Sequence, residues 1–353
     1  MSAGGRPHAL VARLDSAGDV LLQGPALRAV AAGSGRVSFL CGPRGAAAAE
    51  LLPGIDEVLV FRAEWIDPEP RPVSKPAIDD LVGRIAGLRP DLGIILTSFH
   101  QSPLPLALLL RLAGIPRLAA ISDDYPGSLL DVRHRLPENL HEVERSLSLA
   151  RAAGFDLPDG DEGCLRVRRS GRLPEQLAAH RPYVVVHPGA SAPARAWSPS
   201  RHRQLVDLLA GRGRHVVVTG SREEAPLVAE VAGPPRPEVL ALAGRTPLPV
   251  LAEALAAADA VVVGNTGPAH LAAAVGTPVV SLFAPVVPAE RWRPWRVRHA
   301  LLGRQDAACA GSRARQCPVP GHPCLDTVTA AEVAAAVEAL GPRRRGLPVE
   351  ARQ

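Results

Sequence analysis

Long hydrophobic runs are missing from this chain of 353 residues. The longest purely apolar stretches, such as residues 104–110, are far shorter than the ~20 residues that span a bilayer. The apolar segment at residues 9–14 is too short for a signal peptide and contains Arg13. We therefore expect a cytoplasmic protein that could contact the inner membrane face peripherally.

Lysine and aromatic residues are also scarce. Lys75 is the single lysine, and aromatic residues make up 3% of the chain. No motif combines basic with aromatic side chains, so the net charge of +5 predicts solvated arginines or weak attraction to anionic surfaces. We expect no nucleic-acid partner.

The five cysteines are an odd count in a long chain, which does not fit a secreted disulfide scaffold. Cys309, Cys317, His322 and Cys324 lie close together in sequence and have the residue types of a zinc site. Their spacing matches no familiar finger, so a loop ordered by packing, or a disulfide under oxidation, is the alternative. The acidic pair in Asp159-Gly160-Asp161 is expected to be a solvated turn. We predict no metal site.

Strand-like and helix-like segments alternate in two blocks, which predicts α/β domains with parallel sheets covered by helices on both faces. The first block has expected strands at 9–13, 37–40, 57–61, 92–97 and 117–121, and expected helices at 20–32, 45–52, 77–88, 104–113 and 134–153. The second has expected strands at 183–187, 215–219, 239–243, 260–263 and 279–283, and expected helices within 199–211, 222–232, 248–258, 269–275 and 330–340. We expect an N-terminal domain at 1–165, a linker at 166–182, a C-terminal domain at 183–340 and a basic flexible tail at 341–353.

A polar turn in the second block is the clearest candidate for a binding site. Gly264-Asn265-Thr266-Gly267-Pro268 follows an expected strand and opens a helix. Open α/β sheets bind ligands at the carboxyl ends of their strands. The backbone N–H groups and the positive end of a helix suit a phosphate, and Pro268 loses no hydrogen bond at the start of a helix.

Three other turns after expected strands carry polar side chains. Gly18-Asp19 offers either a general base or an N-cap for the helix expected at Val20. His187-Pro188-Gly189-Ala190-Ser191, followed by Arg195, fits a phosphate clamp or an ordinary surface loop. Thr219-Gly220-Ser221-Arg222-Glu223-Glu224 offers carboxylates to a ribose, or merely acidic residues at a helix N-terminus.

Nicotinamide and flavin cofactors are not expected. Gly33-Ser34-Gly35 and Gly211-Arg212-Gly213 precede strands and lack the third glycine, whereas a Rossmann fingerprint follows a strand and opens a helix. The chain has no Walker P-loop and no Gly-x-Ser-x-Gly nucleophile elbow.

Taken in order, the motifs resemble glycosyltransferase family 9, the bacterial heptosyltransferases of lipopolysaccharide core synthesis and their relatives. The resemblance runs from residue 9 to residue 340. It is carried by GDVLL at 18–22, HPGAS at 187–191, Arg195 and Trp197, GSREE at 220–224, GRT at 244–246 and GNTGPAHLAAAVGTPVV at 264–280. The segment from Cys317 to Leu325 is similar to the end of a subgroup.

The resemblance implies a GT-B architecture, in which two Rossmann-like, doubly wound domains face a cleft. The first domain would bind the acceptor and the second the nucleotide-sugar. Asp19 would be the catalytic base, Arg195 would contact the donor phosphates, and Thr246 would lie near the nucleobase. Glu223 or Glu224 would reach the ribose. The remaining expected donor-binding residues are Ser191, Gly220, Ser221, Asn265, Thr266, Gly267, Pro268 and His270.

The implied reaction is an inverting, metal-independent transfer of a heptose or related sugar from an ADP-heptose-like donor. The acceptor would be a cell-envelope glycan or glycolipid, and the protein is expected to act as a monomer without a cofactor. Some members have Asp where this chain has Asn265, and Lys is common where it has Arg195, which leaves the donor preference open. A GT-B-like nucleotide-sugar epimerase or hydrolase, and a non-catalytic nucleotide-sugar-binding protein, are the alternatives.

Overall fold

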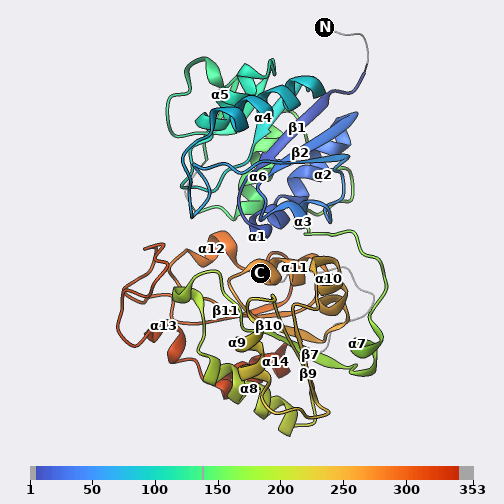
Figure 1. The fold of residues 1–353 in the computed structure, drawn as a ribbon, viewed down its shortest axis with the longest axis vertical. Coiled ribbons are helices and arrows are strands. Elements are labelled where there is room, and N and C mark those ends of the chain that lie inside the picture. The colour runs from blue at the N-terminus through green and yellow to red at the C-terminus, as the bar shows by residue number, and fades with distance from the viewer. Residues whose placement is uncertain (1–4, 137–138, 342–353) are drawn as a thin grey trace. The chain divides into compact units, whose positions relative to one another are not determined.

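The computed structural model describes residues 5–136 and 139–341. The chain divides into two compact units, Met1–Arg168 and Arg169–Gln353, which are drawn as a ribbon in Figure 1. The division falls within the segment expected to be a linker. Beyond Gly341, the expected basic tail lies outside the described residues.

The first unit is built on a parallel sheet with the strand order β3-β2-β1-β4-β5-β6. Its strands in the described residues are β1 (His8–Arg13), β2 (Arg36–Cys41), β3 (Glu57–Val60), β4 (Leu92–Ile95), β5 (Leu118–Ile121) and β6 (Val132–His134). The chain winds outward from β1 to β3 and then returns to β4, so the topological switch point lies between β1 and β4. In sheets of this order, ligands bind at the carboxyl edge beside that point.

Helices cover both faces of this sheet. They are α1 (Ala17–Leu22), α2 (Gly24–Gly33), α3 (Ala46–Ala49), α4 (Lys75–Leu88), α5 (Leu104–Leu112), the short 3-10 helix η1 (Gly127–Leu129) and α6 (Glu142–Ala152). Side chains alternate between faces along a strand. Leu10 and Ala12 of β1 therefore join the core under α4 and α5, which pack together in Figure 1. Arg13 points to the opposite face, where its side chain meets Glu142 of α6.

For two helices of this unit, the predicted N-terminal residue was wrong. The helix expected from Val20 begins at Ala17 behind the N-cap Ser16, and the chain forms two helices separated at Gln23. The helix expected from residue 134 begins at Glu142, because the His141 imidazole accepts a hydrogen bond from the backbone N–H of Val143. Residues 132–134 instead form β6 at the edge of the sheet.

In the acidic turn at 159–161, Asp159 and Gly160 are exposed as expected, but Asp161 is anchored, which corrects the expectation for that residue. The Asp161 carboxylate accepts hydrogen bonds from Arg28 Nε at 2.6 Å and Nη2 at 2.9 Å, and its side chain is 5% exposed. Arg28 also donates to the carbonyl of Cys164. The ion pair thereby ties the end of the first unit to α2.

We expect the substitution Asp161→Asn to lower the free energy of unfolding by about 3 kcal/mol, because it leaves the buried Arg28 guanidinium without its charge partner. The Arg28 hydrogen bonds hold the pKa of Asp161 below its ordinary value. The contribution of this ion pair to the free energy of unfolding is therefore complete at neutral pH and is lost as the pH falls below about 4. Urea denaturation of wild type and variant at pH 7 and pH 3 measures this. A difference that stays constant between the two pH values would contradict it.

The second unit repeats the plan with the strand order β12-β11-β10-β7-β8-β9, again fully parallel. Its strands in the described part are β7 (Tyr183–His187), β8 (His215–Gly220), β9 (Val239–Ala243), β10 (Ala260–Gly264), β11 (Val279–Leu282) and β12 (His299–Leu302). Here the switch point lies between β7 and β10. The alternation in the sequence did not reveal β12.

The helices of the second unit also lie on both faces of its sheet. They are α7 (Glu175–Ala179), the 3-10 helix η2 (Pro193–Arg195), α8 (Pro199–Gly211), α9 (Ala225–Ala232), α10 (Leu248–Ala257), α11 (Gly267–Ala274), α12 (Ala289–Trp292), α13 (Pro323–Asp326) and α14 (Ala330–Leu340). Val184 and Val262 contribute to the core that includes residues of α8, α9 and α14. On the other face, the Tyr183 hydroxyl donates to the carbonyl of Ala254 in α10 at 2.7 Å.

None of the helices within residues 5–136 and 139–341 combines the length and the apolar composition needed to cross a membrane. Together, the two sheets confirm the predicted α/β class. Each places a set of strand-to-helix turns at its carboxyl edge, where the candidate site residues lie.

Candidate functional site

Asp19 lies in the first turn of α1, directly after the central strand β1. It is the third residue of the helix and not its N-cap, but it does take part in capping, because its carboxylate accepts a hydrogen bond from the backbone N–H of the N-cap Ser16. Its Oδ2 accepts a hydrogen bond from the hydroxyl of Ser16 at 2.7 Å, and its side chain remains 22% exposed. The carboxylate is thus held in one orientation while part of it still reaches solvent.

A buried arginine forms ion pairs with Asp19 and with two neighbouring carboxylates. Arg13, at the end of β1, is 1% exposed and lies 2.8 Å from Asp15, 3.3 Å from Asp19 and 3.2 Å from Glu142. Its guanidinium also donates to the hydroxyl of Ser98 at 2.7 Å. Burial alone would lower the pKa of Arg13, but the three carboxylates outweigh it and raise that pKa, so the guanidinium stays charged.

Glu142 is the fully buried member of this group, and burial raises its pKa against the opposing effect of Arg13. A second arginine, Arg145, lies 3.2 Å from it one helical turn along α6. Of these residues, Asp19 was predicted from the sequence, whereas Arg13, Asp15 and Glu142 were not. Arg13 carries a detectable signal, because it is a charged residue on the same face of a strand as Ala9 and Val11.

In the second unit, the turn from Gly264 to Pro268 connects β10 to α11 beside the switch point of the sheet. Thr266 is the N-cap of α11, and Asn265 and His270 are buried. Within the described ranges the buried Thr266 hydroxyl oxygen has no hydrogen-bond partner. A polar atom of this kind at the positive end of a helix suits an anionic ligand.

The backbone of Arg195 lies against this turn. It is the last residue of η2, and a Cβ placed on Gly264 would lie 3.3 Å from the Arg195 carbonyl oxygen. The backbone of the preceding residue, Ala194, is fixed on both sides. Its N–H donates to the carbonyl of Arg315 at 3.0 Å, and its carbonyl lies 3.1 Å from His322 Nε2. The long segment before α13 therefore anchors the loop that carries Arg195.

The two glutamates after β8 have different surroundings. Glu224 accepts a hydrogen bond from the N–H of Ser221 at 2.7 Å, and its carboxylate lies against the backbone of Gly189, in the turn after β7. Glu223 is exposed, and its own backbone N–H and the Ser221 hydroxyl hold its pKa below the ordinary value. Glu224, rather than Glu223, is the carboxylate that bridges two turns of the candidate site.

The other expected donor-binding residues are spread along the same edge. Ser191 is exposed after β7, and Thr246 is half-buried after β9, where Gly244 donates to the carbonyl of Gly220. His187, at the end of β7, was not among the expected binding residues. It lies 3.0 Å from the Thr219 hydroxyl, and burial lowers its pKa, although the Glu224 carboxylate acts in the opposite direction.

We expect Gly189→Ala to weaken nucleotide binding, because the added Cβ would lie 2.1 Å from Glu224 Oε1 and displace that carboxylate. The overpacking costs about 1–3 kcal/mol of stability. Thermal unfolding with and without ADP measures both effects. Gly211→Ala is the control, because a Cβ there meets no atom within 4 Å. An unchanged nucleotide-induced shift in the Gly189 variant would contradict the position given to Glu224.

The cysteines do not form a recognisable metal centre. All five are free thiols, and Cys309 and Cys324 are buried in the core of the second unit. Among the residues that the structure describes, no group of three or more His, Cys, Asp or Glu side chains is arranged to hold a metal ion. Burial is the main cause that raises the pKa of Cys324 to about 11, so its thiol stays protonated at neutral pH.

Comparison with known proteins places this arrangement in a family. The model of glycosyltransferase family 9 (heptosyltransferase) matches residues 99–322, which is more than half of the chain. The chain belongs to glycosyltransferase family 9. Lipopolysaccharide heptosyltransferase 3 of Escherichia coli K12 is 33% identical over 164 residues, or 44% of this chain and 47% of that protein. Lipopolysaccharide heptosyltransferase 1 of Pseudomonas aeruginosa is 35% identical over 155 residues, or 42% of this chain and 41% of that protein. These alignments span less than half the length of the relatives.

Solved structures of this family confirm the predicted GT-B architecture. A family 9 glycosyltransferase from Veillonella parvula superposes with a TM-score of 0.77 at 18% identity, covering 96% of this chain and 98% of that chain. E. coli ADP-heptose lps heptosyltransferase II gives a TM-score of 0.71 at 20% identity, covering 94% and 98%. An E. coli heptosyltransferase solved with ADP gives 0.66 at 20% identity, covering 94% and 97%. At these identities the likeness concerns the fold.

Proposed function

We propose that this family 9 member transfers a heptose or related sugar from an ADP-heptose-like donor to a hydroxyl group of a cell-envelope glycan or glycolipid, such as lipopolysaccharide core. The observation that carries the proposal is the set of turns beside the switch point of the second sheet. There, the backbone of Arg195 lies against Gly264, Thr266 caps α11, and the Glu224 carboxylate lies against Gly189. The names of the relatives support heptose as the sugar and ADP as the first nucleotide to test.

The proposed reaction forms one bond and breaks another. Asp19 takes the proton of the acceptor hydroxyl as its oxygen attacks the anomeric carbon. The bond from that carbon to the diphosphate breaks, and the nucleoside diphosphate leaves with the electron pair. Attack opposite to the leaving group inverts the configuration at the anomeric carbon.

Negative charge builds on the leaving diphosphate during this step. In the proposal, the Arg195 guanidinium and the N-terminal end of α11 stabilise that charge without a metal ion. Glu224 would accept hydrogen bonds from the ribose hydroxyls, and Thr246 would lie beside the base. The uncharged Asn265 suits a site that receives a diphosphate, since a carboxylate there would repel it.

A thermal-shift screen of ADP, GDP, UDP and their sugars tests the donor assignment. We expect ADP and ADP-heptose to raise the melting temperature most, since a ligand at 100 times its Kd adds about 2.7 kcal/mol to stability. No stabilisation by any nucleotide would contradict the proposal. Turnover of the nucleotide-sugar without an acceptor would favour an epimerase or hydrolase, and donor binding without product would favour a non-catalytic binding protein.

Cytoplasmic location, a monomeric state and peripheral contact with the inner membrane belong to the same proposal. A donor made in the cytoplasm and a membrane-borne acceptor would meet at that membrane face. Sedimentation of the purified protein, alone and with vesicles of anionic phospholipid, measures the oligomeric state and the membrane contact together.

A further inference from the structure

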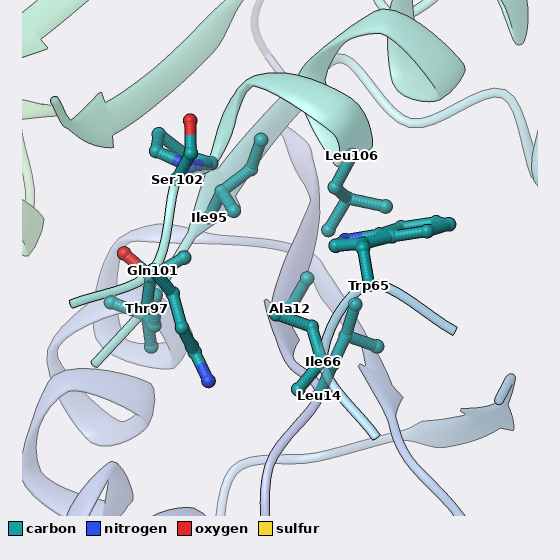
Figure 2. Close-up of a pocket in the computed structure, with 11 residues that line it drawn as sticks. Ala12, Leu14, Trp65, Ile66, Ile95, Thr97, Gln101, Ser102 and Leu106 are labelled. Atoms are coloured by element: carbon teal, nitrogen blue, oxygen red, sulfur yellow. The ribbon is translucent and has the colours of Figure 1, made fainter. Parts of the chain in front are cut away.

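The first unit has a second feature at its switch point, an apolar pocket that the proposed reaction does not use. Figure 2 shows Ala12 of β1 and Ile95 of β4 between two groups of side chains. Trp65 and Leu106 lie on one side, and Thr97, Gln101 and Ser102 lie on the other. The pocket is therefore formed by the two strands that flank the switch point, where ligands bind in sheets of this order.

Three of the apolar lining residues, Leu14, Trp65 and Ile66, are only half-buried, so they form the mouth of the pocket. The indole of Trp65 is supported by Phe61, with 5.9 Å between the ring centroids. The free space inside amounts to about one water molecule. A methyl group has a similar size, and apolar walls favour it over water.

The polar side of the pocket is neutral. No charged side chain lines it, and its polar lining residues are Thr97, Gln101 and Ser102. Gln101 is engaged on its inner side, where its Oε1 accepts from the N–H of Ser98 and its Nε2 donates to Asp15 at 2.5 Å. A charged ligand group would lose hydration here without gaining a partner.

Gln101 also links the pocket to the catalytic candidate. Asp15, which accepts from Gln101, pairs with Arg13, and Arg13 contacts Asp19. The side chains of Ala12 and Arg13 point to opposite faces of the sheet. The pocket and Asp19 therefore lie on either side of the carboxyl end of β1 and are linked through Asp15 and Arg13.

We propose that the Trp65 pocket binds the acceptor as a neutral sugar ring whose methyl-sized apolar substituent enters the pocket. The ring lies on the indole of Trp65, and a ring hydroxyl bonds to Thr97. This inference extends the proposed function and depends on it in one respect: the bound sugar is an acceptor only if the protein is a transferase. The binding site itself can be measured without a donor.

Three methyl β-D-glycosides that differ only at C6 test the proposal: the fucoside with a methyl group, the galactoside with a hydroxymethyl group and the galacturonide with a carboxylate. Saturation-transfer NMR on the full chain gives their affinities. We expect the fucoside to bind about fourfold more tightly than the galactoside, with its C6 methyl protons most strongly saturated, and we expect no binding of the galacturonide at the same concentration.

Trp65→Ala should abolish saturation of the C6 methyl protons of the fucoside. Thr97→Val should lower the affinity for both neutral sugars, the fucoside and the galactoside. Trp295→Ala, which removes a half-buried tryptophan from the second unit, is the matched control and should change nothing. If Trp65→Ala does not fold, Trp65→Leu keeps apolar packing and removes the flat face. Equal affinities for the three sugars, tightest binding of the galacturonide, or a methyl signal unchanged in the Trp65 variants would overturn the proposal.

The two proposals fail separately. If no nucleotide binds but the fucoside is still preferred, the transferase assignment is wrong and the sugar pocket stands. If ADP binds but the fucoside preference is absent, the pocket is wrong and the donor site stands.

Discussion

Replacing Asp19 with asparagine is expected to lower the rate of sugar transfer by about 10²–10⁴-fold, the range that positioned general bases contribute. Asparagine has the shape of aspartate but cannot take the proton of the acceptor hydroxyl. The proposed donor site lies in the second unit, so the affinity for ADP should be unchanged. Initial rates with the donor and an accepted glycan, together with an ADP titration, measure both quantities.

Stability should change little in this variant. Arg13 has two other carboxylate partners, Asp15 at 2.8 Å and Glu142 at 3.2 Å, and the amide oxygen of asparagine can still accept a hydrogen bond from it. Asp80→Asn, which changes a 67% exposed carboxylate on α4, is the matched control and should leave both rate and stability unchanged. Wild-type turnover in the Asp19 variant would refute its role as the base.

Arg13 and Glu142 illustrate which parts of this site the sequence could and could not predict. The alternation along β1 places Arg13 on one face of the strand, and the sequence contains that information. It does not contain the partner, because Glu142 is 129 residues away and reaches Arg13 only when α6 packs on that face. A buried charge can thus be suspected from a strand pattern, whereas its compensation depends on tertiary structure.

Most strands and helices could be predicted from short sequence patterns, and the reason is physical. The central strand β7 and the edge strand β9 are both short runs of mainly apolar residues that end before Gly, Pro or polar residues, so both were predicted at their observed bounds. The edge strand β6 has Val132 as its one apolar residue, so its sequence lacks the apolar run that marks a strand, and β12 has a run of only three apolar residues, none of them fully buried. The helix at α1 was placed too late because its apolar residues begin at Val20, whereas the helix starts at Ala17, behind the N-cap Ser16.

The choice between Glu223 and Glu224 shows the same limit on a smaller scale. Both follow β8, and either spacing allows a contact with a ribose. Only the structure places Glu224 against Gly189, a residue of a different turn. Such a contact depends on where the first turn of a helix starts, and a shift of one residue in that start exchanges the inward and the outward carboxylate.

We expect Arg195→Ala to reduce kcat/KM for the donor by about 10²–10³-fold, the cost of removing one group that stabilises charge in a transition state. The effect should fall mainly on kcat, because the charge on the diphosphate grows as the bond to the sugar breaks. Arg195→Lys should lose less, since lysine keeps the charge but not the two-pronged geometry of the guanidinium. Initial rates at varied donor concentration separate the two parameters.

The loop that holds Arg195 makes this test specific. It is fixed through the backbone of Ala194, which bonds to Arg315 and His322, so truncating the Arg195 side chain leaves both contacts in place.

His322→Ala does the reverse, because it keeps the Arg195 guanidinium and removes one of the two contacts that hold the loop. If position as well as charge matters, this variant should raise KM for the donor with a smaller effect on kcat. Arg212→Ala, an exposed arginine paired with Glu338, is the control. Unchanged donor kinetics in Arg195→Ala would mean that the helix end of α11 receives the diphosphate without it.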